Sequence, residues 1–205
     1  MVDRYQVAGD QGQFEPGSGG RVLANQLGIV DSEEMDDVEL YLLSRLYQAL
    51  LGDDFPDRAL TVADLQRWHR RWPGNIYGWA GEERSVNMAK DGFQFAAAAQ
   101  ISRLLADFER DCLSRFTPCG HMDESMLIEA IAITHVEFIL MHPFREGNGR
   151  LGRLLADVMT LQARRSPLDY RVWDDNREAY FSAIQFGMGC DYEPMKRMVG
   201  QALAI

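Results

Sequence analysis

The sequence predicts an all-α domain, built as a helical bundle, that carries one small β-hairpin. Apolar residues recur at intervals of three and four along most of the chain after Val22, which is the spacing of one face of an α-helix. Residues 75–95 depart from this spacing, because they combine glycine, aromatic residues and short alternation. The chain has 205 residues, a length that suits one domain with a sizeable core.

The N-terminal stretch differs in composition from the rest of the chain. It is rich in glycine and polar residues (AGDQGQFEPGSGG) and offers little apolar surface to bury. We therefore expect residues 1–21 to form an extended or partly disordered arm, and residues 22–205 to form the domain. No run of eighteen apolar residues occurs, and the first residues lack the apolar core of a signal peptide. These features predict no membrane association and a cytoplasmic location.

The first predicted helix begins at Asp31 or Ser32, because either side chain can accept hydrogen bonds from the free N–H groups of a helix start. Gly52 and Pro56 end this helix. Its expected apolar face consists of Val38, Leu42, Leu46 and Leu50.

A second helix is expected to begin at Thr61 and to end before Pro73, with Leu65 and Trp68 on one face. The hairpin follows, since Asp91-Gly92 separates the short segments SVNM and FQF and is a typical hairpin turn. A hairpin of two strands is marginally stable alone, so it must be supported by the domain or by a partner.

The later helices are expected over residues 94–116, 123–141, about 148–165, 175–188 and 191–203. Pro143 should end the third helix of this series near His142, because proline is poorly accepted inside a helix. The histidine of the same helix, His135, lies in an apolar pattern, and we interpret it as structural.

Charge and cysteine content narrow the functional classes. The net charge is −10, which argues against a general nucleic-acid surface. Three cysteines without metal-ligand spacing, Cys112, Cys119 and Cys190, are typical of reduced thiols rather than of a disulfide framework or a zinc site. Arginines nevertheless cluster between residues 142 and 177, which suggests a local anion site; Arg164 and Arg165 are better explained as solvated helix positions.

The stretch HPFREGNGRLGR, residues 142–153, concentrates the polar chemistry of the chain. Its Gly147-Asn148-Gly149 turn precedes a helix whose first N–H groups are free to bind an anion. Arg150 and Arg153 are three residues apart, share a face of that helix, and could both reach a polyphosphate.

Two further residues of this stretch have chemical uses. Glu146 could hold Mg²⁺ beside phosphate oxygens, and His142 could act as a general base. The spacing alone also allows a plainer interpretation, in which His142-Pro143 ends a helix, Asn148-Gly149 makes a turn and the arginines are surface residues.

This stretch resembles the signature of the Fic family, HPFx(D/E)GNGRxxR, at every fixed position. The segment YGWAGEERSVNMAKDGFQFA is similar to the flap region of that family, and NREAYFSAIQFG is similar to its C-terminal nucleotide-proximal helix. Together they cover the chain from about residue 22 to its end. The resemblance implies the Fic fold, which is an all-α core with a β-hairpin flap.

The same resemblance implies adenylyl transfer, in which ATP donates AMP to a Tyr, Thr or Ser hydroxyl of a target protein and pyrophosphate is released. His142 would be the base that deprotonates the hydroxyl. Glu146 would hold the Mg²⁺ that bridges the α- and β-phosphates. Gly147, Asn148 and Gly149 would form the anion hole, with Asn148 on the α-phosphate.

Other residues take roles by the same comparison. Arg150 would support the phosphates, Arg153 would bind the γ-phosphate, and Tyr180 would lie near the nucleoside. Phe144 would pack inward and anchor the loop, whereas Arg145 occupies a variable position and receives no role. The flap would dock the target segment by strand addition, through Arg84, Ser85, Val86, Asn87 and Met88.

Three positions refine this expectation. The phosphotransferase branch of the family carries lysine where this chain has Gly149, so Gly149 favours AMP transfer. Phe181 and Met188 stand where other members place a tyrosine and an asparagine, which leaves the nucleotide preference open. A Fic enzyme with another nucleotide or phosphate donor, or one that removes AMP, is therefore the alternative, and a non-enzymatic binding module is a third hypothesis.

Regulation is the last expectation from the sequence. Many Fic proteins carry an inhibitory helix with the pattern (S/T)xxxE(G/N), whose glutamate pairs with the second arginine of the signature. Residues 125–129 (SMLIE) fit its first five places, but Ala130 follows and the segment precedes the signature directly. The resemblance then implies a small separate antitoxin protein that supplies the glutamate, with the first helix, residues 38–50, as its expected docking surface. In related toxins the target is a type II topoisomerase subunit.

Overall fold

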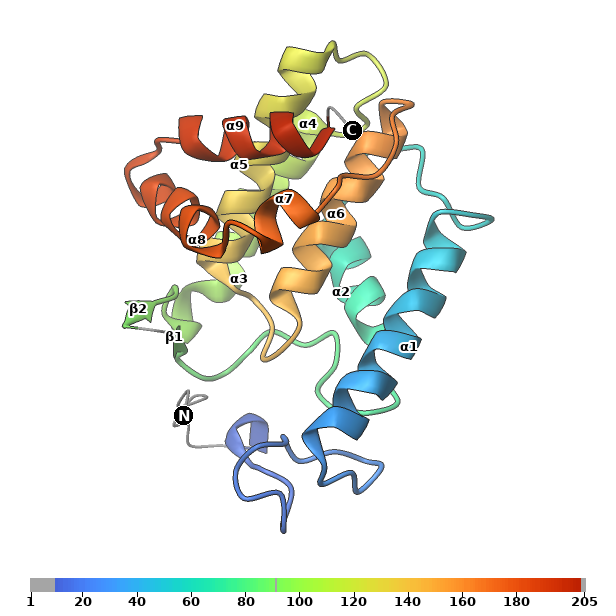
Figure 1. The fold of residues 1–205 in the computed structure, drawn as a ribbon, viewed down its shortest axis with the longest axis vertical. Coiled ribbons are helices and arrows are strands. Elements are labelled where there is room, and N and C mark those ends of the chain that lie inside the picture. Colours follow the sequence, from blue (N-terminus) through green and yellow to red (C-terminus); the bar gives the residue numbers. More distant parts are fainter. Residues whose placement is uncertain (1–9, 91, 204–205) are drawn as a thin grey trace.

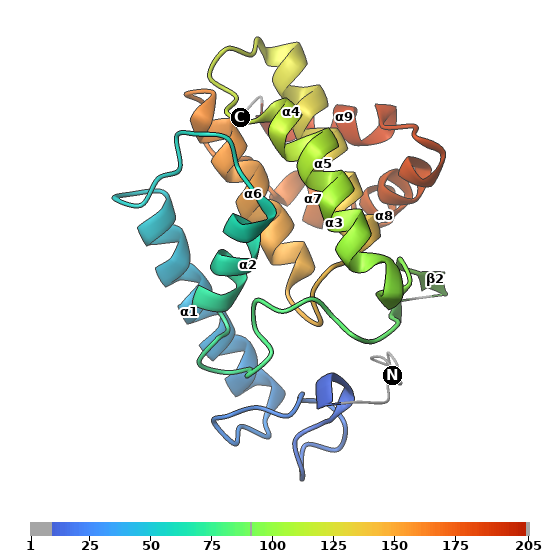
Figure 2. The same ribbon diagram turned by 180° about the vertical axis from the view of Figure 1, so that it is seen from behind.

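The computed structural model describes residues 10–90 and 92–203. Two long helices, α5 (Glu124–Met141) and α6 (Asn148–Gln162), pack against each other in the centre of the molecule (Figure 1). Around them, α7 (Arg171–Asp174), α8 (Arg177–Phe186) and α9 (Glu193–Leu203) cover one side, and α1 (Ser32–Leu50) and α2 (Val62–Arg71) lie on the other (Figures 1 and 2). The predicted all-α class with one small hairpin is confirmed.

The ends of the helices follow the residues that the sequence singles out. The Asp31 carboxylate accepts the N–H groups of Glu33 and Glu34 and caps α1. Thr61 and Asp64 form a capping box at the start of α2. These caps satisfy donors that have no partner within the helix, so the predicted starts of both helices are confirmed.

The buried face of α1 is rotated from the predicted one. Met35, Glu39, Leu43, Leu46 and Leu50 are buried, whereas Val38 and Leu42 are only partly buried. A carboxylate therefore lies on the inner face of the helix, where an apolar pattern would not place one. The partner that makes this burial tolerable is an arginine of the signature stretch.

The helix expected over residues 94–116 begins later and is divided. A 3-10 turn, η2 (Ala98–Gln100), precedes α3 (Ile101–Phe108), which continues through a π-helical segment, η3 (Glu109–Leu113), into α4 (Ser114–Phe116). The residues before Ala98 belong to the hairpin and to its return toward the bundle.

The hairpin consists of β1 (Ala89–Lys90) and β2 (Phe93–Gln94), which are antiparallel, with Ala89 opposite Gln94 and Lys90 opposite Phe93. Gly92 in the turn has a φ of +80°, a conformation that favours glycine. Asp91 lies outside the described residues. The predicted hairpin is present, but its strands are shorter than SVNM and FQF. Residues 85–87 lie outside β1, and the Met88 carbonyl accepts the N–H of Phe95.

Residues 10–23 differ from the expected extended arm. They form a folded loop that begins with the 3-10 turn η1 (Asp10–Gly12) and includes a bridge between Phe14 and Leu23. The side chains of Gln11 and Ser18 are buried. Backbone hydrogen bonds close the loop on itself, which compensates for its low apolar content. Residues 1–9 lie outside the described residues.

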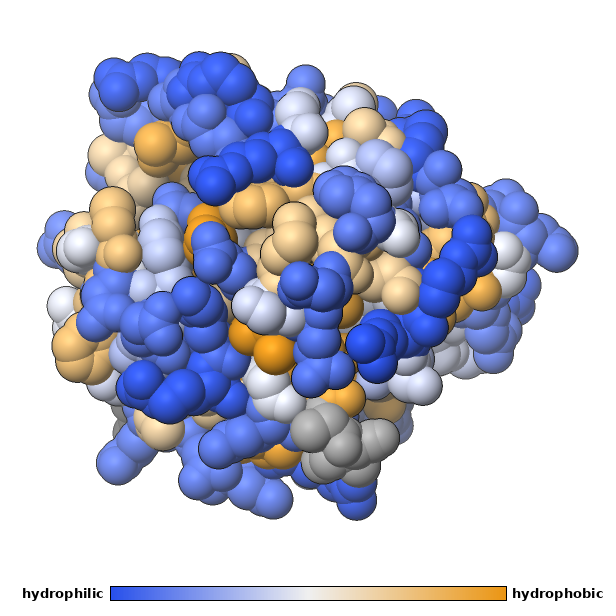
Figure 3. Space-filling view, turned by 90° about the horizontal axis from the view of Figure 1, so that it is seen from above, coloured by the Kyte–Doolittle hydropathy of each residue, from blue (hydrophilic) through white to orange (hydrophobic). Residues whose placement is uncertain are grey.

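The main core lies between α5, α6 and the helices that surround them, and it includes Phe138, Phe144, Leu151 and Trp173. From above, hydrophilic side chains divide the hydrophobic areas of the surface into small parts (Figure 3). Cys112 and Cys119 are buried free thiols and Cys190 is an exposed one. Within the described ranges, no helix has both the length and the apolar character that a membrane span requires.

Candidate active site

The site is built on the loop between α5 and α6. At the end of α5, His142 adopts a left-handed conformation with φ 52° and ψ 61°, which turns the chain sharply out of the helix. Phe144 follows and is fully buried, so it anchors the loop in the core. Gly147 then caps α6 with a φ of +79°.

Asn148 holds this loop closed through its side chain. Its Oδ1 accepts the N–H of Phe144 at 2.9 Å, and its Nδ2 donates to the Phe144 carbonyl at 2.7 Å. Each polar atom of this side chain thus has one partner within the loop, while Nδ2 keeps a second N–H, so the contact of Asn148 with an α-phosphate stays a prediction. The N–H groups of the first turn of α6 remain as the anion donors.

The glycines of the loop are not equivalent. A Cβ built on Gly147 would lie 2.5 Å from the Trp72 ring, so this position requires glycine for space as well as for its positive φ. A Cβ on Gly149 would meet no atom within 4 Å. Gly149 is thus not required by packing, and the space in front of it is open.

His69 on α2 is a second support of the loop, and the sequence gives no clear signal for it. Its Nδ1 accepts the N–H of Gly81, so its Nε2 carries the proton and donates to the Glu146 carbonyl at 3.0 Å. Its ring stacks on Phe144 with centroids 4.1 Å apart. Burial lowers the pKa of His69 to about 4, which keeps the ring neutral.

The imidazole of His142 is held in one tautomer. Its Nδ1 lies 3.3 Å from the carbonyl oxygen of Ile139, which can only accept, so Nδ1 carries the proton and Nε2 can accept one. Phe95 stacks on the ring with centroids 3.8 Å apart. Burial lowers the pKa of His142 to about 3, with a smaller contribution from the Arg84 cation.

Arg84 has a different position from the one expected for a flap residue. It is fully buried, and its Nε donates to the His142 carbonyl at 2.6 Å while Nη1 donates to the Val86 carbonyl at 2.6 Å. Further bonds reach the carbonyls of Met141 and Ala96. Its side chain therefore ties the flap to the turn at His142 and does not face a target, whereas its part in docking by strand addition stays a prediction.

The rest of the flap segment alternates in burial. Val86 and Met88 are buried, whereas Ser85 and Asn87 are exposed. Val86 and Met88 are therefore unable to offer their side chains to a partner. The N-terminal loop holds the start of the segment, because the Gln11 amide accepts the Ser85 N–H at 2.9 Å and donates to the Glu83 carbonyl at 3.3 Å.

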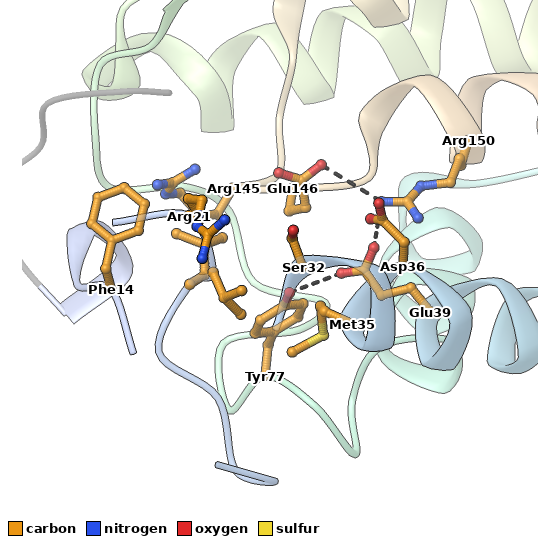
Figure 4. A pocket seen from close by; sticks show the side chains of 12 residues that line it. Phe14, Arg21, Ser32, Met35, Asp36, Glu39, Tyr77, Arg145, Glu146 and Arg150 are labelled. Carbon is orange, nitrogen blue, oxygen red and sulfur yellow. Dashed lines mark hydrogen bonds and ion pairs between the residues drawn. The ribbon is translucent and has the colours of Figure 1, made fainter. Parts of the chain in front are cut away.

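Arg150 is paired on the side of the site that faces α1. Its Nη2 lies 2.6 Å from a carboxylate oxygen of Glu39, and its guanidinium lies over the Trp72 ring at 4.6 Å. Tyr77 donates to the other Glu39 oxygen at 2.8 Å, as Figure 4 shows. Burial is the main reason that the pKa of Glu39 is raised, and Arg150 partly offsets this.

Arg153 is paired on the opposite side. The Asp174 carboxylate on α7 accepts two hydrogen bonds from the guanidinium, one from Nη2 at 2.5 Å and one from Nη1 at 3.1 Å. The guanidinium lies 4.8 Å from the Tyr170 ring and 6.0 Å from the Trp173 ring. The two arginines thus share one helix, as predicted, but their partners come from different parts of the chain.

A pocket of about 420 Å³ brings most of these groups together. Tyr180 lines it and is held by His135, whose Nε2 accepts the tyrosine hydroxyl proton at 2.8 Å while Nδ1 donates to the Gly152 carbonyl. His135 is therefore structural, as expected. Phe181 also lines the pocket, whereas Met188 lines a different one. Further lining residues are Lys90, Phe93, Phe95, Ile139, His142, Arg145, Glu146, Gly147, Asn148, Gly149, Arg150, Arg153, Trp173, Asp174, Arg177, Ile184 and Gln185.

Glu146 is the acidic residue of the signature that could ligate a cation. Its side chain is one-third exposed, one oxygen accepts the Gly147 N–H, and the same oxygen lies 3.7 Å from Arg150. Among the residues that the structure describes, no cluster of three or more His, Cys, Asp or Glu side chains is arranged to hold a metal ion. A cation bound here would therefore need oxygen ligands from a phosphate or from water.

Comparisons with known proteins identify the family. A family model described as Fic/DOC family matches residues 59–160. The protein named "Probable protein adenylyltransferase y4lH" of Sinorhizobium fredii is 30% identical over 151 residues, which cover 71% of this chain and 73% of that protein. The chain belongs to the Fic/DOC family. Glu39 and Asp174, the partners of the two arginines, both lie outside the segment that the Fic/DOC model matches.

Other Fic relatives are longer than this chain. Protein adenylyltransferase VbhT of Bartonella schoenbuchensis is 29% identical over 130 residues, or 63% of this chain, and the match spans only 27% of VbhT. The crystal structure of BepC from Bartonella tribocorum with bound AMPPNP has the same fold, with a TM-score of 0.75 at 20% identity, over 94% of this chain and 96% of that one.

Proposed function

We propose that this Fic chain is a protein adenylyltransferase that transfers AMP from ATP to a Tyr, Thr or Ser hydroxyl of a target protein. The observation that carries the proposal is one pocket lined by His142, Glu146, the first turn of α6 and both signature arginines. A base, an anion-binding helix start and two guanidinium groups at one pocket suit nucleotidyl transfer. The adenylyltransferase names of its relatives support the same activity.

The transfer step follows from the state of His142. Its Nε2 takes the proton of the target hydroxyl, and the hydroxyl oxygen forms a bond to the α-phosphorus. The bond between that phosphorus and the α–β bridging oxygen breaks, and pyrophosphate leaves with the electron pair. The low pKa keeps His142 unprotonated at neutral pH, so the base is ready before the substrate binds.

The phosphates would be bound by the N–H groups at the start of α6, by Arg150 and by Arg153. Gly149 supports the AMP-donating orientation, since no side chain fills the space in front of it. Glu146 fits a Mg²⁺ ligand, because one carboxylate combined with phosphate oxygens and water is a common setting for this ion. The ion would neutralise phosphate charge beside this carboxylate.

The target would dock on the hairpin and on the exposed side chains of Ser85 and Asn87, with main-chain hydrogen bonds as in strand addition. A type II topoisomerase subunit is the proposed target class. We place the chain in the cytoplasm as the toxin of a toxin–antitoxin pair. Glu129, at the end of the SMLIE segment, lies on α5 and pairs with Lys196, which supports an inhibitory glutamate from a separate antitoxin. Leu40 and Tyr41 on α1 are exposed and offer apolar contact to such a protein.

The deciding experiment uses ATP labelled at either the α- or the γ-phosphate, mixed with the purified chain and a bacterial lysate. We expect the α-label to appear on protein and the γ-label to remain in solution. His142→Ala should lower transfer at least about 100-fold, the usual contribution of a general base, and should still bind ATP. Transfer of the γ-label alone would show that the chain is a phosphotransferase instead.

A further inference from the structure

The two signature arginines carry counter-ions of very different exposure. The Glu39 side chain is 5% exposed and the Asp174 side chain is 56% exposed. Glu39 is fixed further by the Tyr77 hydroxyl, and its own carbonyl accepts the Trp72 indole N–H at 2.8 Å. Within the described part of the chain, Asp174 forms one ion pair, with Arg153, and it lies at the end of the four-residue helix α7.

We propose that Asp174 is an exchangeable counter-ion of Arg153, which the terminal phosphate of a nucleoside triphosphate must displace; this rests on the function proposed above. The two Asp174 oxygens occupy the Nη1 and Nη2 edge of the guanidinium. A phosphate binds that edge with the same two-pronged geometry, so the carboxylate and the phosphate compete for it.

The surroundings of Arg153 suit such an exchange. The rings of Tyr170 and Trp173 hold the guanidinium from its faces, and the Tyr170 hydroxyl donates to the Arg153 carbonyl at 2.7 Å. These contacts do not involve the Nη1 and Nη2 edge that binds Asp174, so the arginine can stay in place when Asp174 leaves. The freed carboxylate is exposed to water, and solvation compensates much of its lost pairing.

Asp174 then makes the affinity for a nucleotide depend on its number of phosphates. A triphosphate that reaches Arg153 must break the pair and tolerate a nearby carboxylate of like charge, whereas a monophosphate bound at the start of α6 need not touch the pair. Asp174 thus lowers affinity for ATP without changing affinity for AMP. After transfer, its return to Arg153 opposes bound pyrophosphate and favours product release.

The test is calorimetric titration of the full chain with ATP and with AMP, in the presence of Mg²⁺. Asp174→Asn removes the charge but keeps the shape, and Asp175→Asn, at the exposed neighbouring position, is the matched control. We expect Asp174→Asn to tighten ATP binding about 5-fold, the upper end of the worth of an exposed ion pair. Binding of AMP should change less than 2-fold, and Asp175→Asn should change neither.

Unchanged or weaker ATP binding by Asp174→Asn overturns the inference, and so does an equal gain for ATP and AMP. A wild-type chain that binds ATP but transfers no AMP contradicts the proposed function and leaves this measurement valid. A wild-type chain that binds no ATP overturns both. A second readout is the KM for ATP in the labelling assay, which should fall in Asp174→Asn.

Discussion

Arg150 and Arg153 are three residues apart on α6 and are similarly exposed, yet their counter-ions differ sharply in burial. Arg150 is bound to a buried carboxylate from α1 and lies on a tryptophan of the α2 region. Arg153 is bound to an exposed carboxylate from α7. A buried ion pair is costly to break because the remaining charge loses its partner in a poorly solvated place, whereas an exposed pair exchanges readily with water or ligand.

One helix face thus carries one arginine on a buried carboxylate and a second arginine on an exposed carboxylate. Both counter-ions lie outside the segment that the family model matches, so they are contributed by the parts of the chain that surround the common core. The Arg150 side should therefore control stability, and the Arg153 side should control nucleotide binding. The following experiments separate these two roles, in order of expected effect.

Gly147→Ala should have the largest effect on stability. Its Cβ would meet the Trp72 ring on the Arg150 side, and its φ of +79° is unfavourable for alanine. Steric overlap and backbone strain together should lower the free energy of unfolding by about 4 kcal/mol, measured by urea denaturation. Gly149→Ala is the matched control, since a Cβ there meets no atom within 4 Å, and it should change stability by less than about 1 kcal/mol. Equal effects of the two changes would contradict this assignment.

Glu39→Ala should lower the free energy of unfolding by about 2–3 kcal/mol, below the usual cost of breaking a buried pair because Arg150 is one-third exposed and can be partly solvated. The Tyr77 hydroxyl also loses its acceptor. Urea denaturation would measure the change, with Glu34→Ala on the exposed face of the same helix as control. A loss no greater than that of the control would show that this pair is not structural.

Lowering the pH should lower the free energy of unfolding, because buried histidines support the site on both sides. His69 lies beside the Glu146 loop and His135 beside Tyr180, and burial lowers the pKa of each from 6.5 to about 4. Below pH 6.5 the unfolded chain binds protons that the folded chain excludes, so stability falls as the pH falls toward about 4. Burial also lowers the pKa of His142, so three histidines each contribute up to about 1.4 kcal/mol per pH unit. Burial raises the pKa of Asp157 to about 6, which offsets about one of these contributions, so we expect a net loss of roughly 2–3 kcal/mol between pH 6 and pH 5. Denaturation curves that coincide at these two pH values would refute the prediction.

Arg153→Ala should have the smallest effect on stability, at most about 1 kcal/mol, because it removes an exposed pair and a contact with the Tyr170 ring. Its effect on ATP binding should nevertheless be at least about 10-fold, the scale of one charge-assisted pair. Thermal unfolding and ATP titration of the same sample would test both statements. A variant that unfolds at a clearly lower temperature and still binds ATP normally would contradict both statements.

The sequence alone determined the helical class, the caps at Asp31 and Thr61, the hairpin turn and the residues of the signature loop. Each of these depends on local chemistry: apolar spacing, side chains that accept helix N–H groups, a proline that ends a helix, and glycines that allow a left-handed turn. These features depend on neighbours in the chain, so they are visible without a structure.

The tertiary structure alone decided which polar atoms are occupied. The Asn148 side chain bonds to the Phe144 backbone, and the Arg84 side chain is buried and bonded to the His142 carbonyl. The counter-ions Glu39 and Asp174 are 111 and 21 residues from their arginines. No periodicity or motif encodes such pairs, because they form only when helices that are distant in the sequence pack together and bring opposite charges into contact.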